Sequence, residues 1–149
     1  MKIALVTPAG ARSRYGNRTT AARWAGLLRG LGHEVRVEVT WSGIRADAMI
    51  ALHARRSHDS IRRFALAFPD QPLIVALTGT DLYRDIRFDS SAQESLRLAT
   101  RLVVLQDMGP CELAARLRAK TRIIYQSARP LHRVAPLKRC FEVCVSGHL

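Results

Sequence analysis

The stretch LIVALTGTDLYRD, residues 73–85, decides how this chain folds. Its first five residues are all apolar, which is typical of a strand buried on both faces of a parallel sheet. The loop that follows holds a glycine, three hydroxyl side chains and two carboxylates. Ligands of open α/β sheets bind where strands end and loops begin. The stretch therefore predicts a central strand and, directly after it, a candidate site.

Apolar strands alternate with helical patterns on both sides of this stretch. A period-two pattern at residues 34–40 is typical of an edge strand or a half-exposed one. The alternation predicts an α/β fold, a Rossmann-like, doubly wound and mainly parallel sheet with helices on both of its faces. We expect the remaining strands at residues 2–7, 48–52, 101–105 and 121–125.

Four helices are expected between these strands. Apolar spacing predicts them at residues 19–31, around Ile61 to Phe68, after a cap at Ser90 or Ser91, and from Gly109 onward. In the last, Pro110 takes the first position, and an inner face would be formed by Leu113, Ala114 and Leu117. Of the two tryptophans, we assign Trp24 to packing and Trp41 to the surface.

Composition limits the class of protein. The 149 residues suffice for one α/β domain, and no run approaches the roughly 18 apolar residues of a membrane span. Without a recognisable export signal, we expect a cytoplasmic protein. A net charge of +12 favours anionic partners, but an aromatic content of 6% gives little material for stacking nucleic-acid bases. We therefore favour small anionic ligands over nucleic acid.

Three cysteines raise the question of a metal site. Cys140, Cys144 and His148 form a Cys-x3-Cys-x3-His array, which has one ligand fewer than a closed tetrahedral zinc site. Cys140 and Cys144 also bracket an apolar run, where buried thiols are common. We expect neither a metal nor a cofactor.

The chain changes character near its end. We interpret residues 1–127 as the Rossmann-like domain and residues 128–140, rich in bases and containing two prolines, as a linker. Residues 141–149 then read as the first strand of a second domain that the sequence cuts short.

Several segments together resemble a known family. They are KIALVTP at residues 2–8, SRYGNRTTAARWA at 13–25, ADAMIALHARRS at 46–57, the stretch at 73–85, LVVLQ at 102–106, RIIYQSA at 122–128 and FEVCVSGHL at 141–149. As a set they are similar to the N-terminal half of GT-B glycosyltransferases, which have two Rossmann-like domains, of the family 4-like type. Within that type they resemble the selenosugar synthases of selenoneine biosynthesis.

The resemblance implies an activity. It implies transfer of N-acetylglucosamine from UDP-N-acetylglucosamine to the selenium of selenophosphate, with the acceptor on the N-terminal side of an interdomain cleft. It also implies that most donor contacts come from a C-terminal domain that these 149 residues lack. We therefore expect the isolated chain to be nearly inactive without that domain or a partner subunit.

Site residues are expected at the strand ends. Gly16, Asn17, Arg18 and Thr19 open the first helix, where backbone amides and a guanidinium suit a phosphate. Selenophosphate brings an already ionised nucleophile, so the site needs positioning and charge stabilisation more than a strong base. A solvated arginine is the alternative for Arg18.

The strand at residues 48–52 leads directly into His53, Arg55 and Arg56. We expect His53 to be catalytic, by donating to a leaving oxygen or orienting the acceptor, and both arginines to bind the anion. The alternative is a satisfied core histidine beside an exposed arginine pair.

The loop after residue 77 supplies a third group. Asp81 is expected to be catalytic, with Thr78, Gly79 and Thr80 binding substrate. An ordinary turn with Asp81 or Asp85 capping backbone amides is the alternative. Further along the chain, strand ends also carry candidates for substrate binding: Gln106, Gln126 and Ser127.

Two other function classes stay open. One is a Rossmann-like module that binds a nucleotide or anion without catalysis. The other is a basic module that binds nucleic acid through the arginine-rich residues 113–141.

Overall fold

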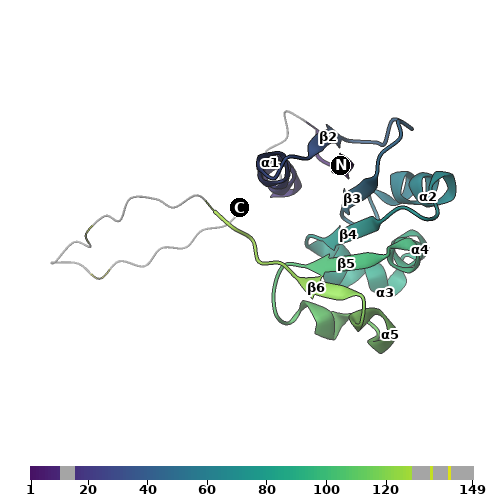
Figure 1. Cartoon of the computed structure of the whole chain (residues 1–149). Coiled ribbons are helices and arrows are strands. Elements are labelled where there is room, and N and C mark those ends of the chain that lie inside the picture. Colours follow the sequence, from purple (N-terminus) through teal and green to yellow (C-terminus); the bar gives the residue numbers. More distant parts are fainter. Residues whose placement is uncertain (11–15, 129–134, 136–140, 142–149) are drawn as a thin grey trace.

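Six parallel strands form the central sheet of the protein (Figure 1). The computed structural model describes residues 1–10, 16–128, 135 and 141. The strand order is β2-β1-β3-β4-β5-β6. Their bounds are Lys2–Val6 for β1, Glu34–Glu38 for β2, Ala48–Leu52 for β3, Leu73–Leu77 for β4, Arg101–Val104 for β5 and Thr121–Ile123 for β6. The predicted α/β class and parallel sheet are confirmed.

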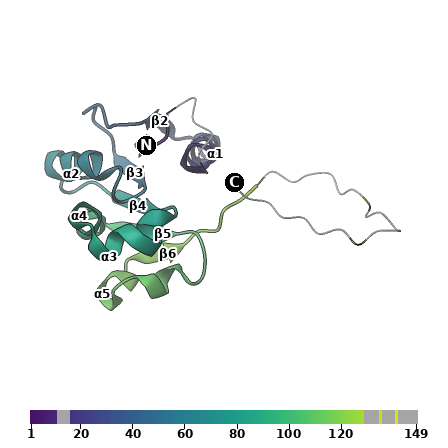
Figure 2. The same ribbon diagram turned by 180° about the vertical axis from the view of Figure 1, so that it is seen from behind.

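Helices cover the two faces of the sheet unequally. On one face α1 (Gly16–Gly30) packs Ala21 and Ala25 against β1, β2 and β3. The other face carries α2 (His58–Ala67), α3 (Ile86–Phe88), α4 (Ser90–Leu98) and α5 (Ala115–Arg118), as Figures 1 and 2 show from opposite sides. The helices thus lie on both faces, as predicted.

The larger part of the core lies under α2 and α4. Phe64 and Leu96 from these helices meet strand residues Val75 and Leu102. Trp41 joins them with 4% of its surface exposed, so its assignment to the surface was wrong. Its indole N–H donates to the Ile44 carbonyl at 3.1 Å, and its ring packs edge-on against Phe64. This partner for the polar N–H allows the large ring to be buried.

Two helix predictions need correction. The cap of α4 is Asp89 instead of Ser90 or Ser91, and its carboxylate accepts a hydrogen bond from the Ala92 N–H at 2.8 Å. The helix expected from Gly109 is broken. A 3₁₀ turn at Gly109–Glu112 ends at Leu113, which has extended backbone, and α5 starts only at Ala115.

The expected inner face of that helix also differs. Leu113 is buried and Leu117 partly buried, whereas Ala114 is exposed, because the break turns it outward. The expected edge strand is confirmed as β2 and ends at Glu38.

Some expectations fall on other parts of the chain. Cys140, Cys144 and His148 lie outside the described residues, as do nearly all of the expected linker and second domain. Within the described ranges, no helix has both the length and the hydropathy to cross a membrane.

Candidate functional site

The carboxyl ends of β1, β3 and β4 bring most of the expected site residues to one edge of the sheet. We call this edge the carboxyl rim: the loops that follow these three strands and the start of α1. β1 pairs with β2 on one side and with β3 on the other. The strand order therefore runs outward from β1 in both directions, and the two directions separate between β1 and β3. Such a switch point is where doubly wound sheets bind their ligands.

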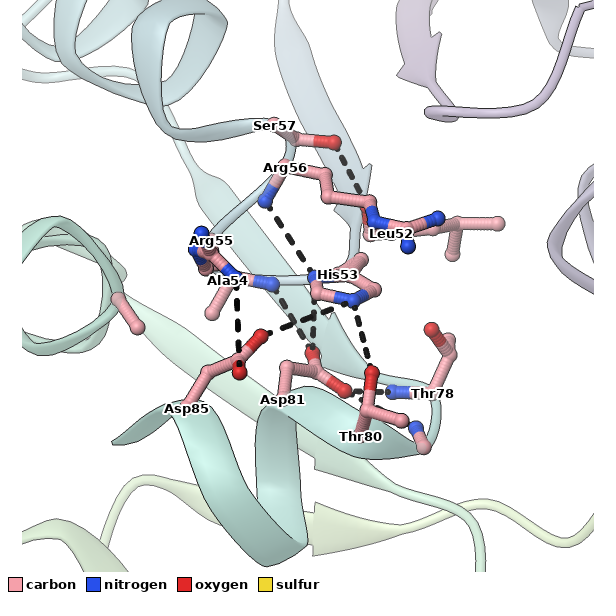
Figure 3. A network of polar contacts seen from close by, with 12 residues as sticks. Leu52, His53, Ala54, Arg55, Arg56, Ser57, Thr78, Thr80, Asp81 and Asp85 are labelled. Carbon is pink, nitrogen blue, oxygen red and sulfur yellow. Dashed lines mark hydrogen bonds and ion pairs between the residues drawn. The ribbon is translucent and has the colours of Figure 1, made fainter. Parts of the chain in front are cut away.

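His53 lies at the centre of the rim, directly after β3. Only 4% of its surface is exposed, and its backbone has a φ of 72°, in the left-handed region that few residues other than glycine adopt. The backbone N–H of Arg56 donates to its Nδ1 at 3.3 Å, and its Nε2 lies 3.3 Å from Oγ1 of Thr80 (Figure 3). Because Nδ1 accepts, the proton of the neutral ring belongs on Nε2, where it can be donated to Thr80.

Burial is the main influence on the pKa of His53. Removal from water lowers this pKa from its ordinary value of 6.5, Asp81 and Asp85 raise it, and Arg56 and Arg55 lower it further. The net effect is a lowered pKa, so His53 is neutral at pH 7. A neutral His53 is a hydrogen-bond donor to Thr80, an exposed residue whose hydroxyl can in turn donate to a ligand.

Asp81 joins the loop after β4 to the loop after β3. It is fully buried, and its Oδ1 accepts hydrogen bonds from the N–H groups of Thr78 at 3.1 Å and Gly79 at 2.9 Å. Its Oδ2 accepts one from the Ala54 N–H at 2.9 Å (Figure 3). Both oxygens are thus occupied by backbone amides, which is the capping arrangement considered as the alternative. This geometry lets Asp81 position the rim, and a catalytic role for it stays a prediction.

The turn after β4 has two further features that bear on ligand binding. Gly79 has a φ of +156°, a conformation that residues with a side chain rarely adopt. The hydroxyl of Thr78 is buried and has no hydrogen-bond partner among the described residues. A buried hydroxyl without a partner costs free energy, and a ligand could relieve that cost here.

The two adjacent arginines have different surroundings. Arg55 turns toward acidic side chains, with its Nε 3.0 Å from Asp89 and its Nη1 3.8 Å from Asp85. Arg56 is exposed, runs away from Arg55 in Figure 3, and forms no ion pair with the described residues. The charge of Arg55 is therefore largely balanced within the fold, whereas that of Arg56 remains available to an anion.

The start of α1 borders the rim at the end of β1. The buried Thr7 donates its hydroxyl to the Asn17 carbonyl at 3.3 Å, which fixes the first turn of the helix beside that strand end. Gly16 and Thr19 are exposed, and Arg18 is half-buried with no ion pair among the described residues. The first turn carries no acidic side chain, so its free amides and Arg18 give this corner a positive potential.

The three remaining candidates bond to other residues of the fold. The Gln106 amide contacts the Tyr83 hydroxyl, and the Gln126 amide donates to Oγ1 of Thr20 at 3.0 Å. Ser127 accepts a hydrogen bond from Nε of Arg23 at 2.6 Å. The last two contacts bring the segment after β6 onto α1. A direct role in ligand binding stays a prediction for all three.

Sequence reasoning considered one acidic side chain at the centre of this network, Asp85, only as an alternative cap for backbone amides. Asp85, only 5% exposed, lies 4.0 Å from Nε2 of His53 and also faces Arg55. The spacing of Asp81 and Asp85 was a usable signal, because residues four apart share one face of a helical turn. Asp85 and Asp89 also line an open hollow of about 290 Å³ with Arg55, Arg84 and Phe88.

Comparison of the sequence with models of known protein families finds no match. Comparison with curated proteins finds no match either. The functional inference therefore depends on the geometry of the rim and on the sequence motifs.

Proposed function

We propose that this chain is the acceptor-side domain of a GT-B glycosyltransferase and that its carboxyl rim binds a small tetrahedral anion. The observation that carries the proposal is the contact between His53 and Thr80 at the carboxyl rim, with Arg56 three residues after His53 in the same loop. A phosphate-like oxyanion needs neutral donors and a guanidinium that is free to bind it, and Arg56 has no ion pair with any residue that the structure describes.

The sequence motifs give the finer proposal that the anion is selenophosphate and the donor is UDP-N-acetylglucosamine. In the reaction a selenium lone pair forms a C–Se bond at the anomeric carbon. The C1–O bond to UDP breaks, and UDP leaves with the bonding electron pair. Hydrolytic loss of phosphate then gives the selenosugar.

This chemistry suits the rim because selenophosphate is already ionised. A strong general base is not required, which agrees with a neutral His53 and with an Asp81 whose oxygens are engaged by backbone amides. Arg56 and the start of α1 would hold the phosphoryl oxygens and leave selenium free to attack. A companion Rossmann-like domain would supply the donor contacts.

Titration calorimetry with selenophosphate, and with phosphate as the stable analogue, tests the anion site. Loss of one charge-assisted contact costs about 1.5–3 kcal/mol, so Arg56→Ala should weaken binding about tenfold to hundredfold. Arg62→Ala is the matched control, since Arg62 is an exposed arginine of α2 that faces Glu94. Equal dissociation constants for the two variants would contradict the proposed site.

A binding module without catalysis is the second candidate, and the engagement of both Asp81 oxygens favours it. An assay of the chain together with a companion donor domain separates the two. Formation of a selenosugar from UDP-N-acetylglucosamine and selenophosphate supports the enzyme. Anion binding without turnover in that assay supports the module.

A further inference from the structure

Half of one sheet face has no helix over it within residues 1–10 and 16–128. From β3 to β6 the strands follow one another in a single direction across the sheet. Right-handed connections between such strands all fall on the same face, so α2 to α5 gather there (Figures 1 and 2). Among the described helices only α1 lies on the opposite face, where it packs against β1, β2 and β3, so that none of them covers β4, β5 and β6 there.

An apolar groove of about 370 Å³ lies on this uncovered face. One wall is formed by Trp24, Leu27 and Leu28 of α1, and Ile74 and Ile124 contribute from the sheet side. Leu27 is 54% exposed and Ile124 is 47% exposed. Contiguous apolar surface of this kind typically marks an interaction site.

Charge narrows the choice of occupant. Two of the described residues that line the groove are arginines, Arg101 and Arg122, and none of these lining residues carries a carboxylate. Among the described residues, Arg101 donates to the Thr100 carbonyl alone, and Arg122 to the carbonyls of Ala119 and Thr121. No carboxylate among the described residues therefore neutralises either guanidinium group, and both can pair with an acidic side chain of a partner.

This charge also excludes a second copy of the chain as the favoured occupant. Each copy carries a net charge of +12, and self-association would bring the two arginine pairs together. The residues beyond 128 are also basic, with one acid, Glu142, in the whole segment, so they do not supply the carboxylates that would pair with the two arginines.

An α-helix is the element that normally covers the face of a parallel sheet.

We propose that the groove is the docking site for an acidic amphipathic α-helix of a partner polypeptide. Apolar side chains of that helix, three and four residues apart, would lie against Trp24, Leu27 and Ile124. Aspartate or glutamate along its border would pair with Arg101 and Arg122. The groove lies on the sheet face and not on the carboxyl rim, so this proposal does not depend on the proposed anion site.

A fluorescein-labelled synthetic helix of about 18 residues, with leucine on one face and glutamate along both borders, is the probe. Fluorescence anisotropy should show saturable binding to the whole chain, with a dissociation constant below about 100 μM. Leu27→Asp should weaken binding at least about tenfold, as loss of a central apolar contact does. Leu66→Asp is the matched control, because Leu66 is 73% exposed on α2, which lies on the other face of the sheet. This variant should bind the probe with the same affinity as the unchanged chain.

A charge exchange tests the electrostatic half of the proposal. The double variant R101E/R122E should bind the glutamate probe at least about tenfold more weakly and should prefer a probe with lysine borders. Circular dichroism must match between variants, so that lost binding is not lost folding.

Three results would overturn the proposal. One is no saturable binding of the glutamate probe by the folded chain. Another is equal affinity of Leu27→Asp and Leu66→Asp. The third is a dimer in sedimentation that Leu27→Asp dissociates, since the groove would then belong to a second copy.

Discussion

Replacement of Asp81 by asparagine tests how the carboxyl rim is held together. The carboxylate accepts three backbone hydrogen bonds while fully buried, two at Oδ1 and one at Oδ2. In Asp81→Asn the amide oxygen can keep the N–H groups of Thr78 and Gly79. The amide nitrogen, a donor, must then face the N–H of Ala54.

The cost follows from that mismatch. A buried N–H left without an acceptor costs about 1–3 kcal/mol, and the two retained bonds lose the contribution of the charge. We expect a total loss of about 3 kcal/mol, a large share of the 5–15 kcal/mol by which typical domains are stable. Because the loops after β3 and β4 would separate, His53 and Thr80 should also lose their contact.

Urea denaturation followed by tryptophan fluorescence measures the loss. With a slope of about 2 kcal/mol per M, the midpoint should fall by about 1.5 M. Asp70→Asn is the control, because Asp70 is exposed in the turn before β4 and should leave the midpoint unchanged. A shift below about 0.3 M for Asp81→Asn would show that these hydrogen bonds do not hold the rim, and would refute the reasoning.

Two further predictions concern pH and packing. Because the pKa of His53 is lowered in the folded protein, the unfolded chain binds more protons at this residue as the pH falls below 6.5. The stability that the neutral, buried His53 contributes is therefore complete above pH 6.5 and is lost as the pH falls. Denaturation midpoints between pH 8 and 5 should therefore fall less in His53→Asn, which tolerates the left-handed backbone, and an equal fall would contradict the burial argument. Gly109→Ala should cost about 1–3 kcal/mol, because the new Cβ would lie 2.7 Å from Cβ of Val104. Gly26→Ala is the control, because Gly26 has open space around it in α1, and it should raise the denaturation midpoint slightly. Equal midpoints for Gly109→Ala and Gly26→Ala would refute the clash with Val104.

The strands could be predicted from the sequence because each carries its own signal. Five-residue apolar runs gave β3 and β4 with their observed bounds, and alternation identified β2 as an edge strand. The break in the helix after Gly109 and the burial of Trp41 could not be predicted. Both depend on packing against elements distant in the sequence, as the contact of Trp41 with Phe64 shows.

The site was predictable as a location more than as a set of roles. His53 and Asp81 were placed at adjoining strand ends by the parallel topology, and they do lie side by side. The neutralisation of Arg55 by Asp89 was not visible, because it joins the turn before α2 to the residue that caps α4, and both α2 and β4 lie between them in the sequence. The left-handed backbone of His53 likewise has no signature in the residues around it.

The central claim is that one anion contacts the loops after β3 and β4 and the start of α1 together. An NMR titration of the ¹⁵N-labelled chain with selenophosphate tests it most directly, since each backbone amide reports separately. We predict saturable shifts with a common dissociation constant at the amides of residues 16–19, 54–56 and 78–80. Shifts confined to other parts of the chain, or different dissociation constants for the three groups, would contradict the claim.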